Sequence, residues 1–291
     1  MMGTITGRTR VVGVWGHPVG HSRSPIMHNA ALSALGLDWV YTAFDVPPAR
    51  LADAVAGVRG LNLVGVNVTV PLKEQVPPFL DTLSDEARRI GAVNTIVNKD
   101  GRLHGDSTDG GGFLRALAEA GRPELFGQRA LLLGAGGSAR AVAFALAGQG
   151  CEVTVANRTG EKAHALAQAV SRCYRGRASA AGWGEDAGRA DLIVNATSLG
   201  LSPHGNAMPA LPPGVLDTRP FVYDLIYNPL ETRLLQAARE AGCSVSNGLS
   251  MLVWQGALSL SLWTGRPLSE MPIAAMVRAV SPLAPEHPVL G

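Results

Sequence analysis

A run of apolar residues breaks into glycines at Gly134 and then takes on a helical pattern. The segment reads Leu131-Leu132-Leu133-Gly134-Ala135-Gly136-Gly137-Ser138-Ala139-Arg140. Gly134 would allow a tight turn out of a strand, Gly136 would let backbone N–H groups approach a pyrophosphate, and Ala139 is small enough for close packing of helix on strand. The N-terminal dipole of that helix would face the same phosphates. The spacing therefore predicts the first βαβ unit of a dinucleotide-binding domain.

The residues after the next apolar run indicate which dinucleotide is bound. The run Glu152–Ala156 ends in Asn157-Arg158-Thr159, about 20 residues beyond the glycines, where the βαβ motif contacts the ribose. An acidic residue there would accept a hydrogen bond from a ribose 2′-hydroxyl, whereas an arginine suits a 2′-phosphate. Arg158, with Lys162 one helical turn further on, predicts NADP(H) rather than NAD(H).

Two serines follow the first apolar run of the chain. Ser22 and Ser24 lie in a polar, glycine-rich loop after the expected strand 11–16. Short hydroxyl side chains beyond the end of a parallel strand lie where open α/β sheets bind small polar ligands. Pro25 would take the first position of a helix through Leu35, so Ser24 is equally suited to cap that helix.

Lys73 is the first residue in the chain that could transfer a proton. It follows the expected strand 63–70, whose Asn67 and Thr69 point to the same side. Pro71 should start a helix and so place Lys73 in its first turn, where the helix dipole opposes a cation. The residue types leave two interpretations open, namely a solvated surface lysine and a lysine that exchanges a proton with a ligand.

Asn94 and Asp109 also have two interpretations each. Asn94 stands before a hairpin that turns at residues 98–101 and could merely satisfy loop backbone. Asp109 precedes the apolar helix 113–120 and could be an ordinary helix cap. The glycines at 110–112 suit a hinge, so we expect a domain boundary near this point. Gln255 falls within the apolar stripe of the expected helix 247–263, where a buried amide needs a partner from the protein or a ligand.

The remaining pattern alternates strands with helices and favours the α/β class. Beyond the strands already mentioned, we expect strands at 39–46, 152–156, 191–198 and 221–227, helices at 47–57, 84–89, 161–171 and 231–241, and an irregular stretch from the end of the helix at 171 to Gly188. A chain of 291 residues, 46% of them hydrophobic and 16% charged, is long enough for two globular domains with separate cores.

Charge and cysteine content exclude several classes of protein. A net charge of +2 points neither to nucleic acid nor to an anionic membrane surface. The three cysteines are scattered and suit reduced thiols, and the sequence contains no cluster typical of a metal site. Neither a secretory signal nor an apolar run of 18 residues is present, so we expect a cytoplasmic protein.

Taken together, the motifs resemble those of the shikimate dehydrogenase family. The matching pieces run from Gly16 to Gln255 in the family's order and at its spacings. They are His21-Ser22-Arg23-Ser24-Pro25, Asn67-Val68-Thr69-Val70-Pro71-Leu72-Lys73, Gly91-Ala92-Val93-Asn94-Thr95, Gly105-Asp106-Ser107-Thr108-Asp109-Gly110, the Gly134 loop, Asn157-Arg158-Thr159 and Gly248-Leu249-Ser250-Met251-Leu252-Val253-Trp254-Gln255.

The resemblance implies an oxidoreductase that acts on a CH–OH group. Its members reduce 3-dehydroshikimate to shikimate reversibly with NADPH, on the route to aromatic amino acids. The fold implied is an α/β substrate domain, residues 1–109 completed by helices in 247–291, and a Rossmann-type NADP domain, residues 110–246, with the active site in the cleft between them. A small-molecule substrate and a monomer or homodimer are expected, with no metal.

Residue roles also follow from the resemblance. Lys73 would exchange the proton of the reacting oxygen, and Asp109 would pair with it and touch substrate. Ser22 and Ser24 would bind the substrate carboxylate, while Thr69, Asn94 and Gln255 would take the ring hydroxyls and Tyr227 would close over the site. The cofactor residues would be Gly134, Ala135, Gly136, Gly137 and Ser138 at the pyrophosphate, Asn157, Arg158, Thr159 and Lys162 at the 2′-phosphate, Leu225 and Gly248 at the nicotinamide and, on a looser match, Asp85.

Two positions depart from the family pattern, and three alternatives remain. Ser107 replaces the more usual Asn, and Ser250 stands where Gly is common; we expect small effects on loop geometry. An NAD-dependent quinate/shikimate dehydrogenase is disfavoured by Arg158 and by the small hydroxyl of Ser24. A catalytically silent ligand sensor is disfavoured because both Lys73 and Asp109 are retained. A folate-pathway dehydrogenase of related shape is disfavoured by the paired serines.

Overall fold

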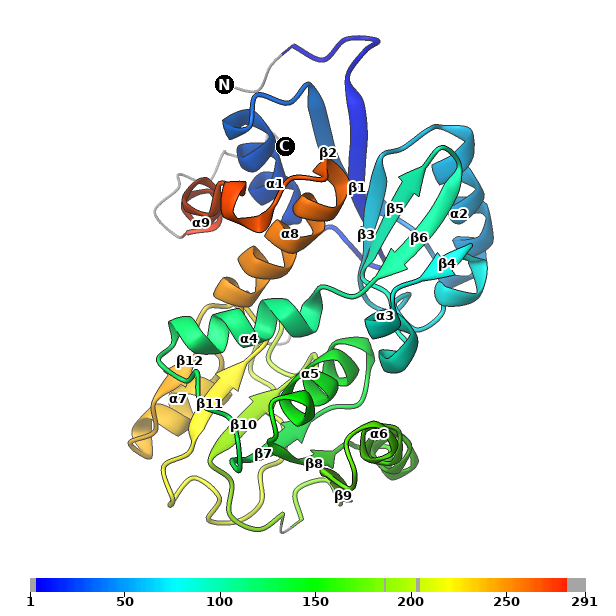
Figure 1. Ribbon diagram of the computed structural model, residues 1–291. Coiled ribbons are helices and arrows are strands. Elements are labelled where there is room, and N and C mark those ends of the chain that lie inside the picture. The colour runs from blue at the N-terminus through cyan, green and yellow to red at the C-terminus, as the bar shows by residue number, and fades with distance from the viewer. Residues whose placement is uncertain (1–3, 186, 203–204, 282–291) are drawn as a thin grey trace. The chain divides into compact units, whose positions relative to one another are not determined.

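The computed structural model describes residues 4–185, 187–202 and 205–281. These residues form two compact units. The first takes in the chain up to Arg88, then Ala92–Thr108 and the chain from Leu252 onward, and the second takes in Arg89–Gly91 and Asp109–Met251. Each unit contains a six-stranded sheet (Figure 1). No helix in the described ranges is long and apolar enough to cross a membrane.

The sheet of the first unit is mixed. Its strands are β1 (Arg10–Gly16), β2 (Trp39–Asp45), β3 (Gly65–Val68), β4 (Thr82–Leu83), β5 (Thr95–Lys99) and β6 (Arg102–Asp106), in the order β2-β1-β3-β5-β6-β4. Strands β1, β2 and β3 are parallel, whereas β5 runs antiparallel to both β3 and β6. Asp100 and Gly101, both at positive φ, join β5 to β6, which confirms the predicted hairpin.

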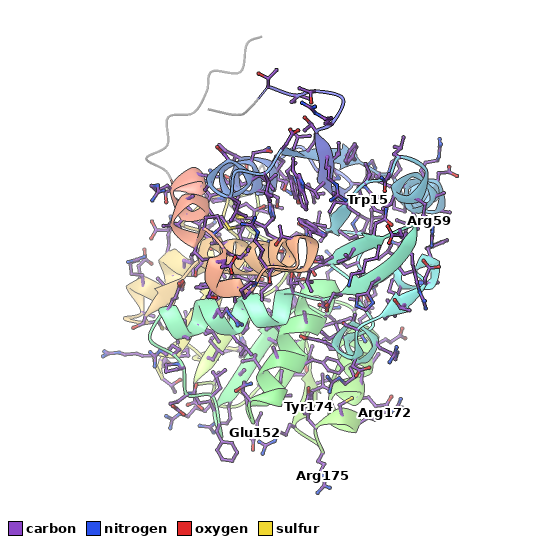
Figure 2. The ribbon with its side chains drawn as sticks, turned by 45° about the horizontal axis from the view of Figure 1, so that its top comes forward. Trp15, Arg59, Glu152, Arg172, Tyr174 and Arg175 are labelled. Carbon is purple, nitrogen blue, oxygen red and sulfur yellow. The ribbon has the colours of Figure 1, made fainter. Side chains whose placement is uncertain are left out.

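Helices cover both faces of this sheet (Figure 1). They are α1 (Ser24–Ala34), α2 (Leu51–Gly60), α8 (Leu249–Thr264, which enters this unit at Leu252) and α9 (Ile273–Val280). Between strands lie α3 (Asp85–Ile90) and the 3-10 turns Pro48–Arg50 and Pro77–Phe79, and a third 3-10 turn, Leu268–Glu270, joins α8 to α9. On the α2 face, Val55 and Val58 pack with Trp15 and Ile96 in one core. Arg59, labelled in Figure 2, donates to the Gly101 carbonyl and to Asp81.

The sheet of the second unit is parallel throughout. Strands β7 (Arg129–Leu133), β8 (Glu152–Ala156), β9 (Ala178–Ala181), β10 (Leu192–Asn195), β11 (Phe221–Asp224) and β12 (Val245–Ser246) lie in the order β12-β11-β10-β7-β8-β9. This is the order of a doubly wound dinucleotide-binding sheet, in which the direction of winding reverses between β7 and β10. The predicted Rossmann-type fold is confirmed.

Four helices flank this second sheet. They are α4 (Asp109–Glu119), α5 (Gly137–Gly148), α6 (Gly160–Cys173) and α7 (Arg233–Glu240). From α4, Phe113 packs edge-on against Tyr223 of β11, with ring centroids 5.2 Å apart. From α7, Leu234 and Leu235 pack into a core with Leu131 and Ile193. Both faces are therefore covered, as a parallel sheet requires.

The prediction that a helix starts at Pro71 is wrong. Residues 70–75 form consecutive turns, in which the Leu72 carbonyl accepts from the N–H groups of Gln75 and Val76. Prolines at 71 and 77 leave too few residues between them for a stable helix. The buried side chains of Leu72 and Val76 hold the turns against the core instead. Lys73 is therefore not subject to a helix dipole.

Smaller differences concern the ends of elements. Ser24 is the first residue of α1 and Arg23 stands at its cap, so the expectation that Ser24 caps the helix is wrong. The stretch 178–188, expected to be irregular, contains β9. On α8, Leu258 is only half-buried and Leu262 is 37% exposed, so the predicted apolar stripe does not coincide with the buried face.

Candidate functional site

Four loops of the first unit meet at one edge of its sheet. Trp15 near the end of β1 pairs with Val68 at the end of β3, and Thr95 at the start of β5 pairs with both Asn67 and Asp106. The loops 17–24, 69–73, 91–94 and 107–108 therefore leave the sheet at the same edge. They carry five predicted site residues from distant parts of the sequence: Ser22, Ser24, Thr69, Lys73 and Asn94.

The hydroxyl residues of this edge are held close to the strands. Ser24 is buried, and its backbone N–H donates to Oγ of the half-buried Ser22 at 3.3 Å. The Thr69 backbone N–H donates to the Trp15 carbonyl at 2.8 Å. A Cβ on Gly16 would lie 2.5 Å from Cγ2 of Thr69, so Gly16 makes room for Thr69 beside the loop that carries the serines.

Lys73 is only 9% exposed. The Lys73 carbonyl accepts a hydrogen bond from the backbone N–H of Val93 at 2.9 Å. Lys73 therefore lies beside the residue that precedes Asn94 in the sequence. Burying an ammonium group is costly unless polar groups or a ligand compensate. Of the two interpretations that the sequence left open, the solvated surface lysine is therefore excluded.

The amide of Asn94 has a defined orientation. Its Oδ1 accepts the Thr108 backbone N–H at 2.8 Å and the Thr95 hydroxyl at 3.0 Å, and its Nδ2 donates to the Thr108 hydroxyl at 2.8 Å. Because a backbone N–H can only donate, the atom facing it must be the amide oxygen. Asn94 therefore turns its NH2 group, a pure donor, away from the Thr108 backbone.

Gln255 joins this cluster from α8. Its Oε1 accepts from Nδ2 of Asn94 at 3.3 Å and its Nε2 donates to the Leu252 carbonyl at 2.8 Å. The partner that a half-buried amide requires is thus supplied by the protein. Neither Thr95 nor Thr108 was singled out from the sequence, although each stands next to a predicted site residue.

Asp109 and Tyr227 belong to the second unit. Asp109 is the first residue of α4 and is 4% exposed, while Tyr227 is half-buried in the segment after β11. Asp85 is strongly exposed in the first turn of α3, and its carboxylate pairs with Arg88 at 2.9 Å.

The glycine-rich turn after β7 suits a pyrophosphate. Gly134 has φ +115, and a Cβ there would lie 3.0 Å from the Ala196 carbonyl oxygen, so only glycine fits without strain. Gly136 precedes α5 in an extended conformation, and no side chain caps the helix. Ala135, Gly137 and Ser138 lie in the same turn, at a helix N-terminus of the kind that binds anions.

The loop after β8 suits a phosphate monoester. Arg158 is exposed and forms no ion pair with any residue that the structure describes, and Lys162 is exposed at the start of α6. Nδ2 of Asn157 donates to the Thr159 carbonyl at 2.9 Å and closes this loop. Both cations lie at the carboxyl end of β8, where proteins of this fold contact the 2′ group of the ribose.

A second basic group lies at the opposite end of β8. Figure 2 shows Arg172, Tyr174 and Arg175 near Glu152, the first residue of that strand. Ligands of doubly wound sheets bind beyond the carboxyl ends of the strands. These two arginines are therefore separate from the nucleotide edge.

A buried carboxylate organises the end of β11. Asp224 accepts from Thr232 at 2.6 Å, from Asn195 at 3.0 Å and from the Ile226 backbone N–H at 3.1 Å. Burial raises the pKa of Asp224 to about 6, although these three donors act in the opposite direction. No specific signal in the sequence marks this residue, since an acidic residue at the end of an apolar strand is common. Its bonds hold the segment that contains Leu225.

Gly248 approaches the same segment closely. Its N–H donates to the Ile226 carbonyl at 3.0 Å, and a Cβ at this position would lie 2.0 Å from the Leu225 carbonyl oxygen. No other residue type fits here without a backbone shift. Leu225 and Gly248 therefore present main chain side by side at the carboxyl end of the sheet.

Three family models match the chain. Residues 14–96 match the shikimate dehydrogenase substrate binding domain, residues 116–201 match shikimate / quinate 5-dehydrogenase, and residues 248–280 match the shikimate 5'-dehydrogenase C-terminal domain. Among curated proteins, the shikimate dehydrogenase (NADP(+)) of Moorella thermoacetica is 51% identical over 95% of this chain and 94% of its own length.

Solved structures agree along nearly the whole chain. A shikimate dehydrogenase crystallised with NADP+ is 42% identical, with a TM-score of 0.89, over 95% of this chain and 96% of its own. The Thermus thermophilus shikimate 5-dehydrogenase in complex with NADP(H) and shikimate is 45% identical, with a TM-score of 0.84, over 94% of this chain and 98% of its own.

Proposed function

The chain belongs to the shikimate dehydrogenase family, and from that premise we propose that it catalyses the reversible NADPH-dependent reduction of 3-dehydroshikimate to shikimate. The strongest support is the arrangement of three residues in the first unit. Lys73, Asn94 and Gln255 come from distant parts of the sequence, yet backbone and side-chain bonds hold them in one cluster of the first unit. A buried lysine beside two oriented amides suits a substrate with several hydroxyl groups and one reacting oxygen.

The first unit supplies most of the substrate contacts in this proposal. Ser22 and Ser24 bind the carboxylate, and Thr69, Asn94 and Gln255 bind the ring hydroxyls. Support comes from the shared sheet edge from which the loops of Ser22, Ser24, Thr69 and Asn94 leave. It comes also from the orientation of Asn94, whose NH2 group would donate to a hydroxyl oxygen in place of the 3.3 Å contact with Oε1 of Gln255. Tyr227, after β11, closes over the substrate.

Lys73 handles the proton. During reduction the carbonyl oxygen gains negative charge, so a protonated Lys73 stabilises that charge and donates its proton; in the reverse direction Lys73 removes the hydroxyl proton. Asp109 acts with Lys73 and also touches the substrate. The nicotinamide, when bound, gives or takes the hydride. The protein then has only to orient the substrate and to supply one proton.

The second unit holds NADP(H) in this proposal, and its residues fit that group. The turn from Gly134 to Ser138 binds the pyrophosphate, because Gly134 has a glycine-only conformation and the start of α5 lacks a side-chain cap. Arg158 and Lys162, with Asn157 and Thr159, surround the 2′-phosphate. Leu225 and Gly248 offer main chain to the nicotinamide. Asp85, which is exposed at the start of α3, is proposed on the looser match as a further cofactor-side residue.

We extend the proposal to the organisation of the chain. Residues 1–109 together with 247–291 form the substrate domain in this proposal, and residues 110–246 form the NADP domain, although Asp109 and residues 247–251 belong to the second compact unit. The protein works in the cytoplasm as a monomer or homodimer, with its three cysteines reduced, in agreement with their free state in the structure.

The test is product formation. The purified chain is incubated with 3-dehydroshikimate and NADPH, the reduced-nicotinamide absorbance is followed, and the product is identified by chromatography against authentic shikimate. Consumption of NADPH with an equal amount of shikimate formed supports the proposal. Binding of both ligands without any turnover would instead identify a ligand sensor.

A further inference from the structure

Ser259 lies in the middle of α8, one helical turn after Gln255, and is completely buried. Its Oγ has four polar neighbours. It accepts from Nδ2 of Asn67 at 2.9 Å and lies 2.8 Å from the Thr95 hydroxyl, 3.0 Å from the Gln255 carbonyl oxygen and 3.2 Å from the Thr108 hydroxyl. A serine inside a helix has no need of so many partners beyond its own helix.

The two hydroxyls that meet at Ser259 also flank the amide of Asn94. Thr95 Oγ1 donates to Oδ1 of Asn94 at 3.0 Å, and Thr108 Oγ1 lies 2.8 Å from Nδ2 of the same amide. Because the Thr95 proton goes to Oδ1 of Asn94, Ser259 can bridge the two threonines by donating to Thr95 and accepting from Thr108. Thr95 contacts the Asn94 amide from the start of β5 and Thr108 contacts it from the loop after β6.

Asn67 closes the cluster from the sheet. Besides Ser259, its Nδ2 approaches the Asn94 carbonyl at 3.1 Å and Thr95 Oγ1 at 3.2 Å, and its Oδ1 accepts the Tyr41 hydroxyl at 2.8 Å. All these groups are buried. Buried hydrogen-bond networks whose members are all satisfied hold one arrangement of their side chains.

We propose that Ser259 is a positioning residue, which acts through Thr95 and Thr108 to set the orientation of the Asn94 amide toward the substrate. The inference rests on the proposed function, in which Asn94 binds a ring hydroxyl. Ser259 itself touches no ligand and exchanges no proton in the reaction. Its removal should therefore weaken substrate binding and leave the chemical step and the binding of NADP(H) unchanged.

The test variant is Ser259→Ala, and the structure indicates that it can fold. Asn67 keeps the Asn94 carbonyl, Thr95 keeps Oδ1 of Asn94, and Thr108 keeps the Gln255 carbonyl as partners. The variant lacks the Ser259 hydroxyl, so the network that orients the Asn94 amide loses the equivalent of one hydrogen bond. This loss should raise the KM for shikimate about three- to tenfold. We expect kcat within twofold of wild type and an unchanged Kd for NADP+, measured by titration without substrate.

The matched control is Ser261→Ala on the same helix. Its hydroxyl donates to the Arg266 carbonyl at 2.6 Å and has no tie to Asn94. This variant should keep the wild-type KM. Thr95→Val removes another member of the network, so the double variant Thr95→Val/Ser259→Ala should raise KM no more than the stronger single variant does, because both act through one amide.

The outcomes separate the two proposals. If the wild-type protein turns over shikimate with NADP+ but Ser259→Ala keeps its KM, or loses shikimate and NADP+ affinity alike, Ser259 is not a positioning residue and the proposed function stands. If the wild-type protein does not turn over shikimate at all, the proposed function fails and this inference fails with it.

Discussion

Oδ1 of Asn94 accepts the backbone N–H of Thr108 at 2.8 Å, which ties the residue before β5 to the residue before Asp109. The bond links two loops that are joined in sequence only through the β5–β6 hairpin. The bond fixes the orientation of the amide, with Oδ1 toward the Thr108 backbone and Nδ2 toward the Thr108 hydroxyl and Oε1 of Gln255. A hydroxyl or carbonyl oxygen recognised by Asn94 must therefore accept from Nδ2 in place of Oε1 of Gln255, which lies 3.3 Å from it.

Lys73→Ala should lower kcat about 100-fold or more while the KM for shikimate stays within several-fold of wild type. The reason is that proton transfer contributes in the transition state and little in the ground state. Steady-state kinetics with saturating NADP+ provides the measurement. Lys99→Ala, at an exposed lysine that ends β5, is the matched control and should change neither constant. Normal kcat with a large rise in KM would assign Lys73 to binding alone.

Arg158→Asp should weaken the binding of NADP(H) far more than the binding of NAD(H), because the new carboxylate repels a 2′-phosphate and suits a 2′-hydroxyl. Equilibrium titration of both cofactors, monitored by fluorescence, measures the effect, and we expect the Kd for NADPH to rise at least about tenfold. Arg175→Asp makes the same change of charge at the opposite end of β8 (Figure 2) and should leave both affinities intact. An equal loss in the two variants would mean that net charge, not Arg158, governs affinity.

Gly248→Ala should destabilise the second unit and impair its cofactor site. The added Cβ would lie 2.0 Å from the Leu225 carbonyl oxygen, and overpacking of this kind costs about 1 to 3 kcal/mol. Gly57→Ala is the control, because a Cβ in that position of α2 meets nothing within 4 Å; it should stabilise the helix by about 0.5 to 1 kcal/mol. Chemical denaturation and NADPH titration of the two variants test this prediction. The prediction is wrong if Gly248→Ala has the wild-type free energy of unfolding and the wild-type affinity for NADPH.

His28 should make the protein sensitive to acid. Its ring stacks on Tyr41 with centroids 4.3 Å apart, and neither ring nitrogen has a hydrogen-bond partner among the described residues. Burial lowers the pKa of His28 to about 3. The unfolded chain therefore binds more protons between this value and the ordinary pKa, and the free energy of unfolding falls as the pH falls through that window.

The size of the effect follows from that window. Between pH 7.5 and pH 5, His28 should cost about 2 kcal/mol of stability. Urea unfolding at the two pH values measures it. His28→Leu cannot take up a proton, so its stability should fall by about 2 kcal/mol less than that of wild type over the same interval, whatever its stability at pH 7.5. Identical losses in both proteins would show that His28 does not titrate in this window.

The residues most predictable from sequence were those whose type is dictated by backbone conformation. Gly134 occupies a φ of +115 that other residues avoid, so the glycine-rich turn was visible without a structure. The hairpin turn at Asp100 and Gly101 has the same origin. The parallel order of the second sheet then follows from the alternation of strands and helices.

The turns around Lys73 and strand β9 were not predictable in the same way. Pro71 is a good first residue for a helix, but Pro77 leaves too few residues for one, and the burial of Leu72 and Val76 in the core holds the turns instead. Strand β9 reads Ala-Ser-Ala-Ala, a composition of low strand propensity, and it forms because β8 offers an edge for pairing. Tertiary contacts overrode local preference in both places.

Ser259 illustrates a further limit. Its partners Asn67, Thr95 and Thr108 lie far away in the sequence, and a serine among apolar helical residues carries no local signal. Lys73, Asn94 and Gln255 could be proposed because motifs carry them. Whether they are brought together depends on strand register, which a single sequence specifies only weakly.

The most direct measurement is the initial rate of nicotinamide reduction with shikimate or quinate, each offered with NADP+ and with NAD+. Our account predicts fast turnover of shikimate with NADP+ and much slower turnover in the other three combinations. Comparable rates with quinate and NAD+ would contradict the assignment of Arg158 to a 2′-phosphate. No turnover in any combination, with binding of both ligands still detectable, would contradict the proposed function of Lys73 and with it the central claim.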